Sequence, residues 1–184
     1  MTFRGKTSMV VSDTGPLISA LQSESVGLIA DLFGTVHTSE VCISELGRHG
    51  WADYLARHHI VGHRLSDAEV ASAAVLAAQI AGHPASKEPN PNHHAGEAEA
   101  MVLVQRPEFA GAVLLLDELA ARAVATTTGL TISGFAGVLL TAVYEGLLAA
   151  DEIRQKLIRC QQQGTHYSNT FIQKIDQIAR EGRE

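Results

Sequence analysis

The sequence predicts an α/β fold built around a parallel or mostly parallel β-sheet. Short apolar segments with the composition of strands alternate with segments that have helical patterns, and this alternation is typical of βαβ units. The chain has 184 residues, of which 46% are hydrophobic and only 18% charged, so it can build one substantial core and is not intrinsically disordered. We therefore expect a single domain over residues 1–184, with its core at about 9–148 and C-terminal helices over 149–184.

Five short apolar segments are the predicted strands. They cover residues 9–12, 34–38, 60–64, 112–116 and 130–132.

The predicted helices lie between and after these strands. Ser66 and Glu69 have the spacing of a capping box, which predicts a helix over 70–80 that ends at Gly82. The following segment, 83–95, holds three of the five prolines and is predicted to be a loop. Ser168 is a plausible N-cap for the last helix. The other expected helices cover residues 39–47, 96–104, 118–127, 135–148, 151–163 and 168–180.

Composition excludes several classes of protein. The formal net charge of −6 argues against a protein that holds nucleic acid through a broad basic surface. The two cysteines, Cys42 and Cys160, do not indicate a disulfide scaffold, so we expect a cytoplasmic protein. Residues 126–144 carry no charge, but their Thr, Ser and Gly content predicts a strand and a helix, and we expect no membrane span.

Two acidic residues directly follow predicted strands. Asp13 comes after the first strand and Asp117 after the fourth. Ligands of open parallel sheets bind at the carboxyl ends of the strands, so both side chains are candidates for one site if these strands are neighbours. Asp13 is equally suited to cap the next helix.

Glutamates at helix positions extend this candidate site. Glu45 lies on the helix after the second strand and can point back over the sheet edge. Glu97 and Glu99 lie at the start of another helix, where the helix dipole alone favours acids. They are about 200° apart around the helix, so only one should face the site, and we prefer Glu97. Clustered carboxylates raise one another's pKa, and a divalent cation such as Mg²⁺ or Mn²⁺ relieves the repulsion.

Five motifs together resemble those of the PIN-domain proteins. The closest likeness is to a prokaryotic branch related to VapC-type toxins, in which D-T-G-P-L-I and G-E-x-E-A recur. The motifs are S-D-T-G-P-L-I at 12–18, S-E-V-C-I-S-E-L at 39–46, G-E-A-E-A at 96–100, L-L-L-D-E-L-A-A-R at 114–122 and T-I-S-G-F-A-G-V-L-L at 131–140.

The resemblance implies a Rossmann-like, three-layer α/β/α sandwich that cleaves RNA with Mg²⁺ or Mn²⁺. Thr14 would assist through its hydroxyl, Glu99 could replace Glu97, and Glu118 could replace Asp117. The implied catalytic residues, which are also the metal ligands, are Asp13, Glu45, Glu97 and Asp117.

Partners also follow from the resemblance. It implies single-stranded or structured RNA as substrate, a homodimer, and an antitoxin protein whose tail covers the acidic groove. Two alternatives stay open: a PIN nuclease of RNA processing that is not a toxin, and a catalytically silent protein-binding module. Nearness in sequence to the acids makes Arg48, Arg106 and Arg122 candidates for holding flanking phosphates. The loop at 83–95, with His93 and His94, and the helices at 149–184 have no assigned role.

Overall fold

Five parallel strands form one sheet in a computed structural model that describes residues 9–51 and 59–182. Their order is β3-β2-β1-β4-β5, and every neighbouring pair is parallel. All five predicted strands are present, and the α/β class is confirmed. The strands are β1 (Val10–Ser12), β2 (Val36–Ser39), β3 (Ile60–His63), β4 (Val113–Leu115) and β5 (Ile132–Ser133).

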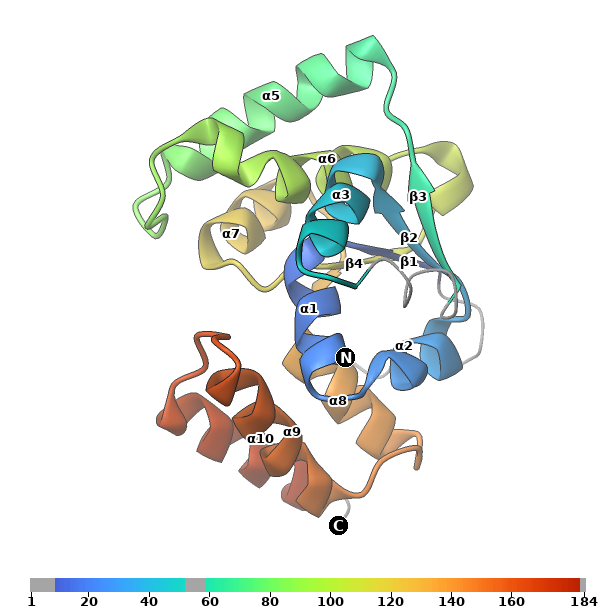
Figure 1. The fold of residues 1–184 in the computed structure, drawn as a ribbon, viewed down its shortest axis with the longest axis vertical. Coiled ribbons are helices and arrows are strands. Elements are labelled where there is room, and N and C mark those ends of the chain that lie inside the picture. Colours follow the sequence, from blue (N-terminus) through green and yellow to red (C-terminus); the bar gives the residue numbers. More distant parts are fainter. Residues whose placement is uncertain (1–8, 52–58, 183–184) are drawn as a thin grey trace.

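Helices cover both faces of the sheet, so the fold is a three-layer α/β/α sandwich (Figure 1). Val10 of β1 packs with α1, α2 and α8, whereas Val11 points to the opposite face and packs with α5, α6 and α7. The C-terminal helices α9 and α10 lie outside the first of these helical layers, where they pack on α8 and α9 also contacts α1 (Figure 1). The helices are α1 (Thr14–Gln22), α2 (Val26–Phe33), α3 (Glu40–Arg48), α5 (Asp67–Ala81), α6 (Ala95–Leu103), α7 (Leu119–Thr127), α8 (Phe135–Tyr144), α9 (Ala150–Gln162) and α10 (Asn169–Glu181), with 3₁₀ turns η1 (Pro91–His94) and η2 (Pro107–Phe109).

The helix ends agree with the capping residues read from the sequence. The Ser66 backbone N–H donates to Glu69 Oε2 at 2.7 Å, and Glu69 N–H donates to Ser66 Oγ, which completes the capping box of α5. Ser168 Oγ accepts from Phe171 N–H at the start of α10. By contrast, α8 ends at Tyr144 rather than at 148, because Gly146 takes a left-handed φ of 75°, which stops the helix.

Two helices, α1 and α2, were not among the segments predicted as helices, although Asp13 was expected to be able to cap a helix after the first strand. Asp13 caps α1, since its Oδ2 accepts from Gly15 N–H at 3.2 Å. Pro16 lies in the first turn of this helix, where a missing N–H costs no hydrogen bond. A Thr-Gly-Pro sequence that looks like a turn therefore begins a helix.

Residues 126–144 divide into the end of α7, β5 and α8, and within the described ranges no helix is long and apolar enough to cross a membrane. Cys42 and Cys160 are both buried and free.

Candidate active site

The sheet brings Asp13 and Asp117 to the same edge. Their strands, β1 and β4, are neighbours with Ser12 opposite Leu115, and the strand order reverses between them. This reversal is where parallel sheets bind ligands. A Cβ placed on Gly15 would lie 3.4 Å from Asp13 Oδ2 and 3.9 Å from the Cβ of Asp117, so both acidic side chains flank this glycine.

Backbone and side-chain donors hold Asp117 in one orientation. Phe135 N–H, at the start of α8, donates to its Oδ1 at 2.9 Å. The Tyr167 hydroxyl, from the segment between α9 and α10, donates to its Oδ2 at 3.2 Å and lies 3.4 Å from Ser19 Oγ. The C-terminal helices thus contribute directly to this site, which the sequence did not reveal.

Thr14 and Glu45 are joined by a short hydrogen bond. Ser39 caps α3 directly after β2, which places Glu45 on the turn that faces the sheet edge. Thr14 Oγ1 donates to Glu45 Oε2 at 2.6 Å. The hydroxyl after the first aspartate therefore orients the glutamate of α3.

The start of α6 lies against these acids because residue 96 is glycine. A Cβ on Gly96 would lie 3.0 Å from Asp13 Oδ1 and 3.5 Å from Glu45 Oε2, so a side chain there would crowd both oxygens. Glu97, the next residue, lines the same cavity, whereas Glu99 does not and instead reaches Ser39.

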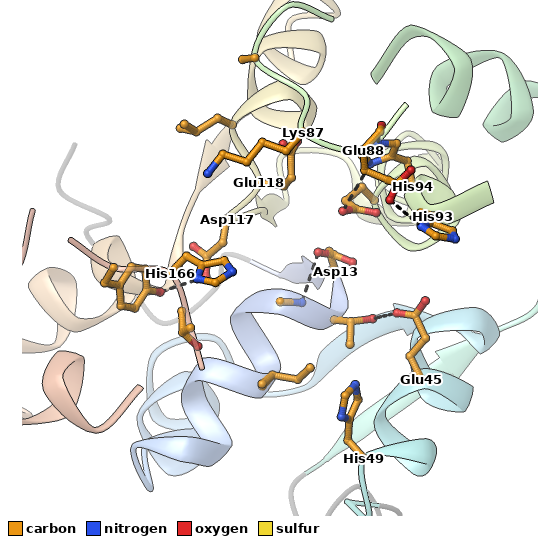
Figure 2. A pocket seen from close by; sticks show the side chains of 18 of the residues that line it. Asp13, Glu45, His49, Lys87, Glu88, His93, His94, Asp117, Glu118 and His166 are labelled. Carbon is orange, nitrogen blue, oxygen red and sulfur yellow. Dashed lines mark hydrogen bonds and ion pairs between the residues drawn. The ribbon is translucent and has the colours of Figure 1, made fainter. Parts of the chain in front are cut away.

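A cavity of about 850 Å³ contains the acidic side chains (Figure 2). In the figure Asp13 lies at its centre, with Asp117 and Glu118 on one side and Glu45 on the other. Glu118 also caps α7, since its Oε2 accepts from Ala121 N–H. The acidic residues in the lining are Asp13, Glu45, Glu88, Glu97, Asp117 and Glu118.

Burial disfavours the charged forms of three of these acids, and repulsion by neighbouring acids adds to this effect for Asp13 and Glu97. Burial, and then the charge of Glu97, raise the pKa of Asp13 well above its usual range. Burial also raises the pKa of Glu97 to about 7, with Glu118 and Glu45 adding to the shift. Burial raises the pKa of Asp117, although Phe135, Tyr167 and Arg122 oppose this. The site therefore favours a bound cation when all three are ionised.

The chemistry of the donors fits a hard divalent cation, although the side chains are not gathered around one point. Carboxylate oxygens are the ligands that Mg²⁺ and Mn²⁺ take, and several share this cavity. Among residues 9–51 and 59–182, however, no three His, Cys, Asp or Glu side chains are close enough to hold an ion as they stand. Side-chain rotation within the cavity would be needed for three acids to share a cation.

Basic side chains surround the acids, but not all those expected from the sequence. Arg48 lines the cavity, and Arg122 lines an adjoining one. The expectation for Arg106 is wrong: its guanidinium is bound to Glu69 Oε1 and Oε2 at 2.7 and 2.9 Å and does not line either cavity. Five other basic groups in the lining had no role assigned from the sequence, and these are His49, Lys87, His93, His94 and His166.

The adjoining cavity, of about 610 Å³, lies on the other side of Asp117. Leu119 and Tyr167 line both cavities, so the two lie side by side. The rings of Tyr167 and Phe171 stack there with centroids 5.3 Å apart, and Leu119 is 69% exposed. An apolar surface with one cation, Arg122, thus borders the acidic cavity.

Comparison with known families gives one match over most of the chain. The model of a family described as DUF3368, PIN domain, matches residues 9–181. No curated protein and no solved structure matches the chain.

Proposed function

Since the chain belongs to the PIN-domain family, whose members are generally nucleases, we propose that it is a metal-dependent endoribonuclease and the toxin of a toxin–antitoxin pair. The observation that carries the proposal is the cavity at the reversal of strand order, where Asp13 and Asp117 meet Glu45 and Glu97. The raised pKa values of Asp13, Glu97 and Asp117 support a site that holds a cation.

Asp13, Glu45, Glu97 and Asp117 would hold the metal. When bound, a divalent cation supplies Lewis acidity toward a phosphate oxygen and lowers the pKa of water. Thr14 fixes the orientation of Glu45, and Tyr167 that of Asp117.

The cysteine beside this site, Cys42, is not suited to act as a nucleophile. Cys42 lies 3.8 Å from Asp13 Oδ1, but burial, with the charge of Asp13, raises the pKa of its thiol to about 12. A thiol that stays protonated is a poor nucleophile. Water is therefore the attacking group that this cavity favours.

Basic and aromatic side chains around the acids support a single-stranded RNA substrate. Lys87 and Arg48 on the cavity rim offer positive charge to flanking phosphates. Beyond Asp117, the stacked rings of Tyr167 and Phe171 suit an unpaired base. We also propose that the tail of an antitoxin covers the acidic cavity, and that the protein acts as a homodimer.

The proposed reaction is tested with purified protein, single-stranded RNA and Mn²⁺ or Mg²⁺. Asp13→Asn and Asp117→Asn should each lower kcat by at least about a hundredfold, because each change removes a ligand rather than a supporting contact. Asp31→Asn on α2 is the matched control, since Asp31 is exposed and lines neither cavity. Equal cleavage by all four proteins would contradict the assignment of the site.

The toxin role is tested separately in cells. Induced expression of the wild-type chain should arrest growth, and Asp13→Asn should not. Unimpaired growth with a protein that cleaves RNA in vitro would instead favour a role in RNA processing.

A further inference from the structure

His94 is a buried histidine between η1 and α6, and its side chain is only 4% exposed. Its Nε2 lies 2.8 Å from the backbone carbonyl oxygen of Glu88 and 3.3 Å from Ser86 Oγ. A carbonyl oxygen only accepts hydrogen bonds, so Nε2 carries the ring proton. In the neutral ring, Nδ1 is then left with a lone pair.

This Nδ1 atom has no hydrogen-bond partner in the part of the chain that the structure describes. It lies 3.9 Å from Glu97 Oε1, in the lining of the acidic cavity. Two acceptors that face each other in a buried place are unfavourable unless a proton or a metal ion lies between them. Figure 2 shows His94 on the side of the cavity opposite His166, with Asp13 between.

The surroundings of His94 match those of a metal-binding imidazole. Histidine ligands commonly donate their other ring N–H to a backbone carbonyl or a carboxylate, which fixes the tautomer and the direction of the ring. The carbonyl of Glu88 has that role here. Ser86 and the 3₁₀ turn η1 hold the segment that carries this carbonyl, so the predicted loop at 83–95 is an ordered support.

We propose that His94 Nδ1 is a ligand of the divalent cation at the acidic site, together with Glu97 and Asp13, and that the site prefers a transition ion such as Mn²⁺ to Mg²⁺. Mg²⁺ takes oxygen ligands almost exclusively, whereas an imidazole nitrogen favours first-row transition ions. The inference rests on the proposed function, because both use the same acids.

The test uses Mn²⁺ and Mg²⁺ alone, without RNA. His94→Gln keeps a side-chain N–H that can reach the Glu88 carbonyl and removes the Nδ1 lone pair. His83→Gln is the matched control, since His83 lies outside both cavities. We expect His94→Gln to weaken Mn²⁺ binding by about 10- to 100-fold and to weaken Mg²⁺ binding much less.

Pulsed electron paramagnetic resonance of the Mn²⁺ complex gives a second readout that does not depend on activity. The wild-type complex should show coupling to a directly bound ¹⁴N nucleus, and His94→Gln should lose it while His83→Gln keeps it. If His94→Gln did not fold, the wild-type spectrum would still decide whether nitrogen binds the ion.

The outcomes separate the two proposals. A Mn²⁺ complex without nitrogen coupling, or coupling that persists in His94→Gln, would overturn the role of His94 and leave RNA cleavage intact. Equal losses of Mn²⁺ and Mg²⁺ affinity in His94→Gln would also overturn it, because an ion pair of His94 with Glu97 that only positions the glutamate predicts that result. Nitrogen-bound Mn²⁺ in a protein that leaves RNA uncut would instead refute the proposed substrate.

Discussion

Replacing Glu97, one of the acids in the cavity, with glutamine should stabilise the metal-free protein by an amount that depends on pH. Burial raises the pKa of Glu97 from 4.5 to about 7. Between pH 4.5 and about 7, Glu97 has released its proton in the unfolded chain but still holds it in the folded chain. The free energy of unfolding therefore falls as the pH rises. One pKa unit corresponds to 1.36 kcal/mol, and the shift of Glu97 is therefore worth about 3 kcal/mol.

Glu97→Gln keeps the shape of the side chain and cannot ionise. In EDTA it should match the wild type at pH 4.5 and exceed its free energy of unfolding by about 3 kcal/mol at pH 7.5. Urea unfolding followed by circular dichroism across this range measures the difference. Glu145→Gln is the control, since Glu145 is exposed at the end of α8 and outside both cavities.

A constant difference between Glu97→Gln and wild type at every pH would refute this reasoning, and so would a variant that is less stable at pH 7.5. Added Mn²⁺ should raise the stability of the wild type at pH 7.5 and narrow the gap, because a bound ion stabilises only the folded state that holds it.

Two further changes test how the acids are positioned. Gly96→Ala should lower kcat at least about tenfold, because its Cβ would crowd Asp13 Oδ1. Gly47→Ala, whose Cβ would have no atom of residues 9–51 or 59–182 within 4 Å, should stabilise α3 by about 0.5–1 kcal/mol. Steady-state kinetics and thermal unfolding of both variants check these expectations. Tyr167→Phe removes a hydrogen bond to Asp117 and should lower the free energy of unfolding by about 1.5–3 kcal/mol if that carboxylate is charged. A variant with the stability and the Mn²⁺ affinity of the wild type would show that this hydrogen bond is dispensable.

The acids at the strand ends could be predicted because their positions follow from the sheet. Asp13 and Asp117 come after apolar strands, and neighbouring parallel strands place such residues together. Glu97 could be preferred to Glu99 because it follows Gly96, which is where α6 approaches the acids. Glu45 could be predicted from its place on the helix after the second strand, and the structure shows how Thr14 orients it.

Residues whose contacts cross long stretches of chain could not be predicted. Tyr167 is 50 residues from Asp117 in sequence, and no local pattern connects the two. Arg106 follows the acidic helix in sequence, yet its side chain turns to Glu69 on α5, so nearness along the chain was misleading. His94 lay in a proline-rich segment that looked like a plain loop, although η1 and the Glu88 carbonyl fix its ring.

The contact of Tyr167 with Asp117 has a consequence for the order in which the chain is made. All five strands and the four acids assigned to the metal lie before residue 134, but one of the two hydrogen bonds that hold Asp117 forms only when the segment between α9 and α10 folds back onto it. Because the ribosome synthesises this segment after all five strands, the contacts that position Asp117 in the cavity are completed at the end of translation. If the chain cleaves RNA as proposed, its active site would be incomplete for as long as the ribosome is still translating its messenger RNA.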